Sequence, residues 1–329
     1  MANQVVLDLD NVSVAYASAN GLVQAVQDVN LQVERNSIVG LVGESGCGKS
    51  TLSYAIMRLL KANAGLTGGT IRVNGQDVYG MSKKELKKFR WNEMSMVFQS
   101  AMSALNPVMT VEDQILDVFK SHRRDMSRVD ALKRARQLLD LVRIDAKHLR
   151  SYPHELSGGM KQRIVIAIAI ALEPSLVTMD EPTTALDVVV QRSILDQIKE
   201  IQSEKNFVIL FISHDFSLVA ELASRVAVMY AGRIVENTVA SELTHIEGHH
   251  PYTQGLIRAI PKLTAEEITI DGIPGNPPDL ISLPSGCAYH PRCPLATDVC
   301  KTTLPGRHVR RHAVIDCHLF APERSTAHV

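Results

Sequence analysis

The sequence predicts an α/β fold: a doubly wound parallel sheet with a helical insert and a small Cys- and Pro-rich C-terminal extension. Short apolar runs alternate with helical patterns, and each run ends in glycine or polar residues, as buried parallel strands do. One run, at residues 37–42, leads through a Gly-rich loop into a helix. Composition then changes near residue 248, because ten of the 14 Pro and four of the five Cys lie beyond it.

Each expected element follows from a local pattern. Apolar and polar residues alternate at 5–16 and 25–33, which predicts half-buried strands. Residues 81–149 are richer in charge and show helical spacing, so we expect a mostly helical insert there. The other expected elements are strands at 37–42, 176–179 and 207–212, and helices at 49–60, 111–119 and 130–142.

Length and charge limit the possible organisation. A chain of 329 residues suggests about two domains, which we expect at 1–247, with the helical insert at about 83–165, and at 248–329. Lys plus Arg equals Asp plus Glu at 35 each, which argues against a nucleic-acid partner. The longest apolar run has nine residues, 164–172, whereas a membrane span needs about 20. With no signal-peptide pattern at the N-terminus, we expect a cytosolic chain.

A phosphate-binding loop is the strongest motif. Residues 43–51 fit G-x-x-x-x-G-K-[ST], in which glycines let backbone N–H groups surround phosphate oxygens. The Lys49 ammonium can reach the β- and γ-phosphates, and the Ser50 hydroxyl can ligate Mg²⁺. A chance Gly-rich turn is the alternative, but the preceding strand and following helix favour nucleotide binding. The candidate nucleotide-binding residues are Gly43, Glu44, Ser45, Gly46, Cys47, Gly48, Lys49, Ser50 and Thr51.

Two acids end the run at 176–179, and a histidine follows the run at 207–212. In a phosphate-loop protein the first acid, Asp180, would hold Mg²⁺, and the second, Glu181, would activate the attacking water. Alternation along a strand sends the two carboxylates in different directions. His214 could contact the γ-phosphate, although a histidine at a strand end is more often structural.

Residues 156–163, Leu-Ser-Gly-Gly-Met-Lys-Gln-Arg, resemble the signature motif of ABC-type ATPases. Ser157 before Gly158 and Gly159 also fits a helix N-cap, and a capped helix start is itself an anion site. Together with the phosphate loop and the acid pair, the resemblance covers residues 5 to about 245. It implies the ABC-type nucleotide-binding fold with a helical subdomain, and ATP hydrolysis with Mg²⁺.

The resemblance assigns roles to further residues. Gln99 is similar to the glutamine that senses Mg²⁺ and the transmembrane partner, which gives Ser50, Gln99 and Asp180 as magnesium ligands. Residues 185–187 resemble the D-loop, which includes Asp187. The remaining implied roles are adenine stacking for Tyr16, general base for Glu181 and switch histidine for His214.

In this family two ATPase domains pack head to tail. Ser157 and Gly159 of one chain would then contact ATP on the phosphate loop of the other, so hydrolysis needs a dimer. We expect a heterodimer, with a homodimer as the alternative.

Two further stretches resemble ATPases of oligopeptide, dipeptide and nickel importers: residues 99–107 after the glutamine, and residues 250–256 with the Pro-rich run 274–278. This resemblance implies an ATP-hydrolysing subunit on the cytoplasmic face of the membrane, docked near residues 99–111 on two permeases. An extracytoplasmic solute-binding protein would act indirectly. The expected solute is a di- or oligopeptide. Nickel or oligosaccharides, an exporter and a soluble ABC ATPase are the alternatives.

Four cysteines, Cys287, Cys293, Cys300 and Cys317, lie in the tail. Four thiolates can bind Zn²⁺ or an iron–sulfur cluster, and the spacing lacks the paired C-x-x-C of common zinc modules. The resemblance to peptide-importer ATPases implies a [4Fe–4S] cluster, with zinc or unligated thiols as alternatives. Arg292, Arg310 and Arg311 are expected to offset thiolate charge. We interpret the fifth cysteine, Cys47, as a small tolerated residue rather than a redox switch.

Overall fold

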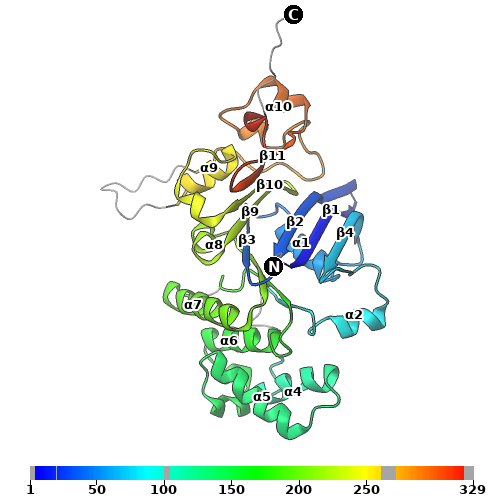
Figure 1. Cartoon of the computed structure of the whole chain (residues 1–329), viewed down its shortest axis with the longest axis vertical. Coiled ribbons are helices and arrows are strands. Elements are labelled where there is room, and N and C mark those ends of the chain that lie inside the picture. Colours follow the sequence, from blue (N-terminus) through cyan, green and yellow to red (C-terminus); the bar gives the residue numbers. More distant parts are fainter. Residues whose placement is uncertain (1–3, 20, 100–103, 185, 261–271, 322–329) are drawn as a thin grey trace, which may run out of the picture.

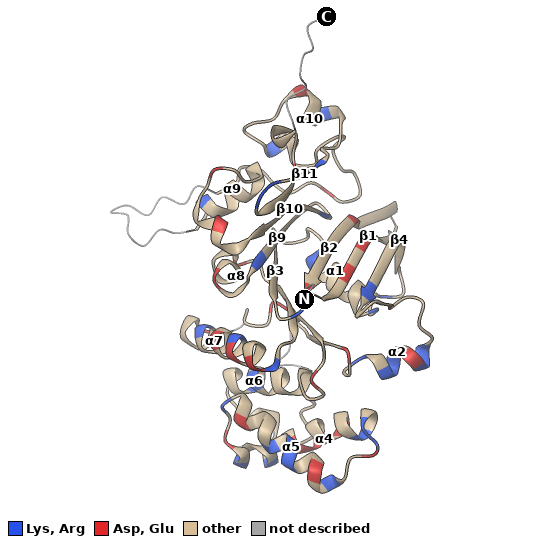
Figure 2. Ribbon diagram, viewed as in Figure 1, with Lys and Arg blue, Asp and Glu red and all other residues tan. Residues whose placement is uncertain are grey.

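The computed structural model describes residues 4–19, 21–99, 104–184, 186–260 and 272–321 (Figure 1). Within these ranges no helix has the length and apolar character needed to cross a membrane. Figure 2 shows acidic and basic residues interspersed over the helices rather than segregated by sign, which agrees with the balanced composition.

A central sheet forms the middle of the molecule. Five of its strands run parallel in the spatial order β9 (Arg225–Tyr230), β3 (Ile38–Val42), β8 (Val208–Ile212), β7 (Leu176–Asp180) and β6 (Met94–Val97). On the β9 side the sheet continues antiparallel through β10 (Arg233–Val239), β12 (Ala313–Asp316) and β11 (Arg307–Val309). The three expected parallel strands are therefore present, at the centre of this sheet.

Alternate residues of the central strands face two separate cores. On β3, Val39 and Leu41 face the core shared with α1 (Lys49–Ile56) and the N-terminal sheet. Ile38 and Val42 face the core formed with the helices on the opposite side, α7 (Val188–Lys205) and α8 (Phe216–Leu222) among them. All five residues of β3 are buried, which is why the strand is an unbroken apolar run.

The N-terminal sheet is antiparallel, with β1 (Val5–Ser18) between β2 (Gly21–Glu34) and β4 (Ala64–Val73), and β5 (Gln76–Asp77) beside β4. Both predicted N-terminal strands are confirmed and run longer than the alternation suggested. Strand β4 was not predicted, because three of its ten residues are glycines, which have low strand preference.

The helical region lies on the side of the central sheet away from the C-terminal extension (Figure 1). It contains α4 (Val111–His122), α5 (Arg128–Leu141) and α6 (Gly158–Ala169), which begin at the N-caps Thr110, Ser127 and Ser157. Short turns η1 (Ala146–Arg150) and η2 (Pro153–Glu155) connect α5 to α6, and α2 (Lys83–Phe89) precedes β6. The segment is mostly helical, as expected, and the exception is β6, where four residues pair with β7. Such a short run between charged segments carries too little periodicity to reveal a strand.

The C-terminal extension joins the central sheet instead of standing apart from it. Strand β12 pairs with β10 through Glu236 and Ile315, Asn237 and Val314, and Thr238 and Ala313. The boundary at 247/248 stays a prediction. The turn η3 (Ala240–Thr244) precedes the extension, whose other elements are α9 (Pro251–Arg258), η4 (His290–Arg292), α10 (Asp298–Thr302) and η5 (His318–Phe320).

Candidate nucleotide-binding site

The phosphate loop connects β3 to α1 in the conformation that its glycines allow. Gly43 and Gly48 have φ angles of 153° and 109°, in the region that favours glycine. A Cβ atom on Gly43 would lie 2.1 Å from the carbonyl oxygen of Met229, and one on Gly48 would lie 2.2 Å from that of Ala25. The loop therefore fits against the backbone of neighbouring strands at two points where only glycine is accommodated.

Lys49 is buried and points back over the loop. Its Nζ donates hydrogen bonds to the carbonyl oxygens of Gly43 at 2.7 Å and Glu44 at 2.9 Å. Cys47 is also buried, and burial raises the pKa of its thiol above the usual value, against the influence of Lys49. A raised pKa disfavours the reactive thiolate, in line with the interpretation of Cys47 as a small packing residue.

Ser50 and Asp180 meet beneath the loop. The Ser50 hydroxyl donates to Oδ1 of Asp180 at 3.1 Å. Asp180 is fully buried, and its Oδ2 has no hydrogen-bond partner among the described residues. Burial raises the pKa of Asp180 despite the hydrogen bond from Ser50. A buried carboxylate oxygen with no partner beside a hydroxyl fits the oxygen ligands that Mg²⁺ prefers.

Glu181 is the centre of a second group. Its Oε2 accepts hydrogen bonds from Gln99 Nε2 at 2.9 Å and Thr184 Oγ1 at 3.2 Å, and its Oε1 lies 3.0 Å from His214 Nδ1. Burial acts to raise the pKa of Glu181, but the bonds from His214, Thr184 and Gln99 outweigh it and leave the pKa below the usual value. The backbone of Glu181 has a φ of 46°, which turns this carboxylate away from the strand direction followed by Asp180.

Gln99 therefore does not join the predicted magnesium ligands in this structure. Of that set, the hydrogen bond joins only Ser50 and Asp180, and Gln99 contacts Glu181 instead. Residues 100–103, part of the stretch that follows Gln99, lie outside the described residues.

Tyr16, the predicted adenine-stacking residue, lies beside the start of α1. It is half-buried on β1, and its hydroxyl is 3.1 Å from Oγ1 of Thr51. The structure thus brings the N-terminal sheet into contact with the far end of the phosphate loop.

The signature residues lie at a separate place, on the helical side. Ser157 is exposed at the N-cap of α6 and accepts a hydrogen bond from the Met160 backbone at 3.3 Å, as the N-cap pattern predicts. Gly159 faces Val190 of α7, where a Cβ atom would come within 2.7 Å of the valine Cγ1. Asp187 caps α7. Of the predicted D-loop, Ala185 lies outside the described residues. Among the described residues, no hydrogen bond joins Ser157, Gly158, Gly159 or Asp187 to the phosphate loop.

One contact of the phosphate loop had no signal in the sequence. Arg292, in the C-terminal extension, forms a two-pronged ion pair with Glu44, and Tyr252 accepts a hydrogen bond from the Glu44 backbone. Arg292 was expected to offset the charge of the tail thiolates, and this is wrong: its guanidinium faces the phosphate loop and pairs with the Glu44 carboxylate. Arg310 lies over the ring of Phe320.

The four tail cysteines gather in one small unit as free thiols. The Cys287 backbone N–H donates to the carbonyl of Cys300 at 2.8 Å. Burial, and then the neighbouring Cys287, Cys293 and Cys300, raise the pKa of Cys317 to about 11. Within the described ranges, however, no three His, Cys, Asp or Glu side chains form a group that could hold one metal ion. The thiols are thus near one another without converging on a single point.

Comparison with known proteins agrees with this geometry. Residues 26–184 match the family described as ABC transporter, and residues 235–300 match the oligopeptide/dipeptide transporter C-terminal region. The chain is 42% identical over 301 residues to the oligopeptide transport ATP-binding protein OppD of Escherichia coli, covering 91% of this chain and 88% of that protein. It is 41% identical over 318 residues to the dipeptide transport ATP-binding protein DppD of Bacillus subtilis, covering 95% and 94%.

Solved structures show the same fold. A dimeric post-hydrolysis state of the ATP-binding cassette MJ0796, bound to ADP and Pi, superposes with a TM-score of 0.63 at 27% identity, covering 71% of this chain and 98% of that one. The cbiO1 protein of Clostridium perfringens, part of the ABC transporter complex cbiONQ, gives a TM-score of 0.64 at 26% identity, covering 73% and 91%. The chain therefore belongs to the oligopeptide/dipeptide family of ABC transporter ATP-binding proteins and is an ATPase.

Proposed function

We propose that this chain powers a membrane importer of di- or oligopeptides by binding and hydrolysing ATP on the cytoplasmic face. ATP hydrolysis is supported mainly by one observation: two acids lie next to the phosphate loop in different surroundings. Asp180 is hydrogen-bonded to Ser50 of the loop, and Glu181 contacts His214. The peptide part is supported by relatives that are oligopeptide and dipeptide transport ATP-binding proteins and match over nearly the whole chain.

In this proposal Glu181 is the general base. Its carboxylate has a pKa below the usual value, so it is ionised at neutral pH and has a free lone pair for a proton from the attacking water. His214 positions the carboxylate through the contact at Oε1 and would sense the γ-phosphate when ATP is bound. Gln99 holds the other carboxylate oxygen, so a movement of the segment after Gln99 would change the base directly.

Binding of ATP would use the remaining residues of the site. Lys49 exchanges its bonds to the loop carbonyls for β- and γ-phosphate oxygens, and the backbone N–H groups of 43–51 surround the phosphates. Ser50 and Asp180 would hold Mg²⁺, and Gln99 would be a further ligand once released from Glu181. A cation held there would supply neutralisation of the charge that develops on the phosphates. Tyr16 stacks on the adenine.

A second cassette completes the site. Ser157, Gly158 and Gly159 lie at the exposed start of α6, where backbone N–H groups and the helix dipole attract phosphate. Because no hydrogen bond joins them to this chain's own loop among the described residues, we assign them, with Asp187, to ATP held by a partner ATPase. The relative MJ0796 is a dimer with ADP and Pi, which supports this arrangement. A heterodimer with a second ABC ATPase is proposed here, as in the sequence prediction.

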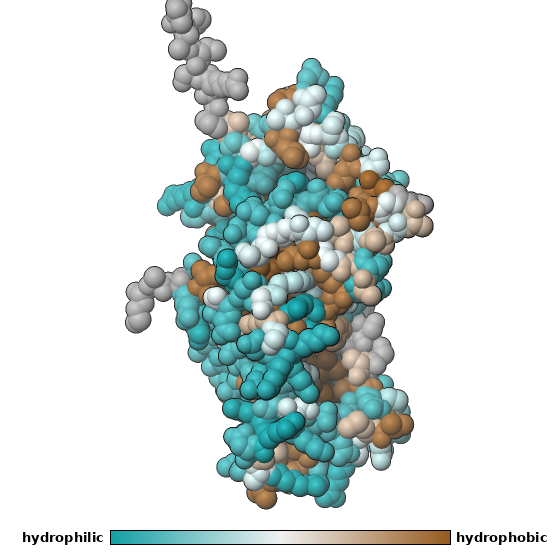
Figure 3. All heavy atoms as spheres, turned by 90° about the vertical axis from the view of Figure 1, so that its right-hand side faces the viewer, coloured by the Kyte–Doolittle hydropathy of each residue, from teal (hydrophilic) through white to brown (hydrophobic). Residues whose placement is uncertain are grey.

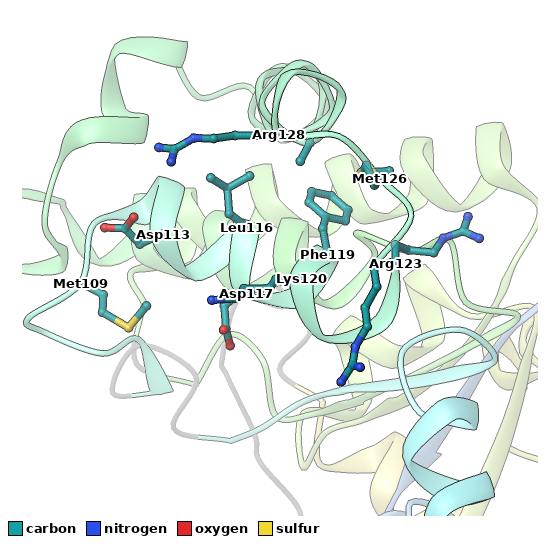
Figure 4. A pocket seen from close by; sticks show the side chains of 11 residues that line it. Met109, Asp113, Leu116, Asp117, Phe119, Lys120, Arg123, Met126 and Arg128 are labelled. Atoms are coloured by element: carbon teal, nitrogen blue, oxygen red, sulfur yellow. The ribbon is translucent and has the colours of Figure 1, made fainter.

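The permeases would dock on the helical region. A cavity of about 730 Å³ opens between Met109 and the helices α4 and α5, with Leu116 and Phe119 on its floor and Lys120 and Arg123 at its edge (Figure 4). A short helix of a permease, apolar on one side and acidic where it meets Lys120 and Arg123, fits these features, while Asp113 and Asp117 of the same cavity would meet its polar or basic residues. Residue 109 is ten positions after Gln99 in the chain, and we propose that docking there acts on Glu181 through Gln99.

The tail cysteines are proposed to hold a [4Fe–4S] cluster. The proposal is supported by the four thiols lying close enough together to raise one another's pKa. Such a centre would stabilise a segment that has little core of its own. Anaerobic purification with iron, sulfide and zinc analysis tests this. About four irons per chain are expected, and zinc without iron would contradict the cluster.

We also propose the domain limits expected from the sequence: an ATPase domain at 1–247 and an extension at 248–329.

The experiment that tests the function is a mild-detergent pull-down of the tagged chain from its native membranes, followed by mass spectrometry. Two permeases, a second ATPase and a solute-binding protein are expected. The variant Leu116→Glu, in the cavity of Figure 4, should lose the permeases, whereas Val299→Glu, on the exposed surface of the extension, should keep them. A soluble homodimer without membrane partners would leave the ATPase intact and refute transport.

Uptake of a labelled tripeptide by cells that carry the wild-type or the Glu181→Gln chain tests the solute. Uptake only with the wild-type chain is expected. Nickel or oligosaccharide uptake without peptide uptake would refute the peptide assignment while keeping the importer.

A further inference from the structure

Residues of the C-terminal extension hydrogen-bond to the phosphate loop at Glu44. Arg292 donates from Nη1 to Oε2 of Glu44 at 2.7 Å and from Nη2 to Oε1 at 2.9 Å. This two-pronged geometry fixes the carboxylate in angle as well as distance. The Arg292 side chain is only 6% exposed and that of Glu44 26%, so water screens the pair weakly.

Arg292 is itself held by the extension. Its Nε donates to the carbonyl oxygen of Pro274 at 2.8 Å, and its guanidinium lies 5.9 Å from the centre of the Tyr230 ring. Arg292 ends η4, and Cys293 of the four-cysteine unit follows directly. The position of the guanidinium is thus set by Pro274 of the extension together with Tyr230 of β9.

Tyr252 provides the second contact. Its hydroxyl accepts a hydrogen bond from the Glu44 backbone N–H at 2.9 Å. The ring is fully buried and packs against Tyr230 and Tyr289, with ring centres 4.6 Å and 5.4 Å away. Both ends of Glu44, its backbone N–H and its carboxylate, are therefore held by residues outside the loop.

Glu44 transmits this restraint to the phosphate-binding lysine, because its carbonyl oxygen accepts a hydrogen bond from Lys49 Nζ at 2.9 Å. Glu44 also brings a negative charge to a loop that must accept a polyphosphate. An unpaired carboxylate there would repel the nucleotide, and Arg292 compensates this charge.

We propose that Arg292 and Tyr252 are positioning residues that hold the phosphate loop through Glu44 and so set the affinity of this chain for ATP. The proposal rests on the proposed role of residues 43–51 in binding the phosphates. It makes the C-terminal extension part of the nucleotide site, although it touches no phosphate.

The test is a double-variant cycle on the purified full chain, measuring the dissociation constant for a non-hydrolysable ATP analogue with Mg²⁺. Arg292→Gln should weaken binding about tenfold or more, since it leaves the Glu44 charge uncompensated. In a Glu44→Gln background the same change should alter binding by about twofold or less, because the charge to be compensated is gone. Arg310→Gln, elsewhere in the extension, is the matched control and should bind like the wild type.

Tyr252→Phe keeps the buried ring and removes only the acceptor for the Glu44 N–H, so it also tests the proposal should Arg292→Gln fail to fold. It should weaken binding by about threefold or more. Unchanged affinity in folded Arg292→Gln or in Tyr252→Phe would overturn the proposal. An equal loss from Arg292→Gln in both backgrounds would do the same, because it would show a structural effect that does not act through Glu44.

Lys49→Ala separates this idea from the proposed role of the loop. If Lys49→Ala binds the analogue as the wild type does, the loop assignment fails, whatever Arg292 does.

Discussion

Replacing Glu181 with Gln tests the chemistry most directly. The carboxylate accepts hydrogen bonds from Gln99 and Thr184 and contacts His214. An amide in its place keeps the size but cannot take a proton from water, and its NH₂ group faces hydrogen-bond donors. Loss of a positioned general base costs about 10²- to 10⁴-fold in rate. That corresponds to about 3 to 5 kcal/mol of transition-state stabilisation at about 1.4 kcal/mol per tenfold.

The assay is ATP turnover by the assembled transporter, with nucleotide affinity measured on the same sample. Affinity should stay within about threefold of the wild type, because the contacts of Lys49 and Asp180 do not involve Glu181. The matched control is Glu173→Gln, which alters only a half-exposed acid paired with Arg134, and it should turn over ATP normally. Unchanged turnover in Glu181→Gln would show that another group activates the water.

Three further predictions follow from the same geometry. Ser157→Arg places a long side chain at the exposed start of α6 and should abolish ATP-driven dimer formation, measured by size-exclusion chromatography; normal dimers would refute the head-to-tail arrangement. Burial disfavours the charged form of His249, but the bond to Glu236 outweighs burial and raises the pKa of His249. The protonated His249 therefore stabilises the folded state fully below about pH 6.5, and this contribution is lost as the pH rises through the pKa of the folded state. The melting temperature should therefore fall more between about pH 6 and pH 9 in the wild type than in His249→Gln, and equal falls would contradict this. Gly43→Ala, whose Cβ would lie 2.1 Å from the Met229 oxygen, should destabilise the fold by about 1–3 kcal/mol in thermal denaturation, and an unchanged melting temperature would count against the close contact.

Local patterns in the sequence were enough to predict the parts of the fold that depend on near neighbours. The buried strands β3, β7 and β8, the phosphate loop and the N-cap Ser157 each have a signature within a few residues. The sequence also predicted that the two acids point in different directions, but the structure separates them by another route: Glu181 lies just past the end of β7 with a φ of 46°.

Features that depend on distant partners could not be predicted in this way. Strand β6 is recognisable only from its pairing with β7, because its four residues have no distinctive pattern. The ion pair of Arg292 with Glu44 spans 248 residues, and Arg292 lies beside a cysteine that offered a nearer explanation for its charge. The contact of Gln99 with Glu181 depends likewise on how two separate strands end at one edge of the sheet.

The surface seen from the side of the molecule is mostly hydrophilic, with apolar side chains gathered in separate patches (Figure 3).

An exposed edge of a β-sheet promotes aggregation, because its unpaired backbone groups can pair with strands of other chains. Here β12 covers the edge of β10, and the outermost strand is β11, only three residues long and followed by Arg310 and Arg311. A chain cut short before β12 would present β10 as a seven-residue open edge, so premature termination would favour aggregation of the whole ATPase rather than the simple loss of an appendage.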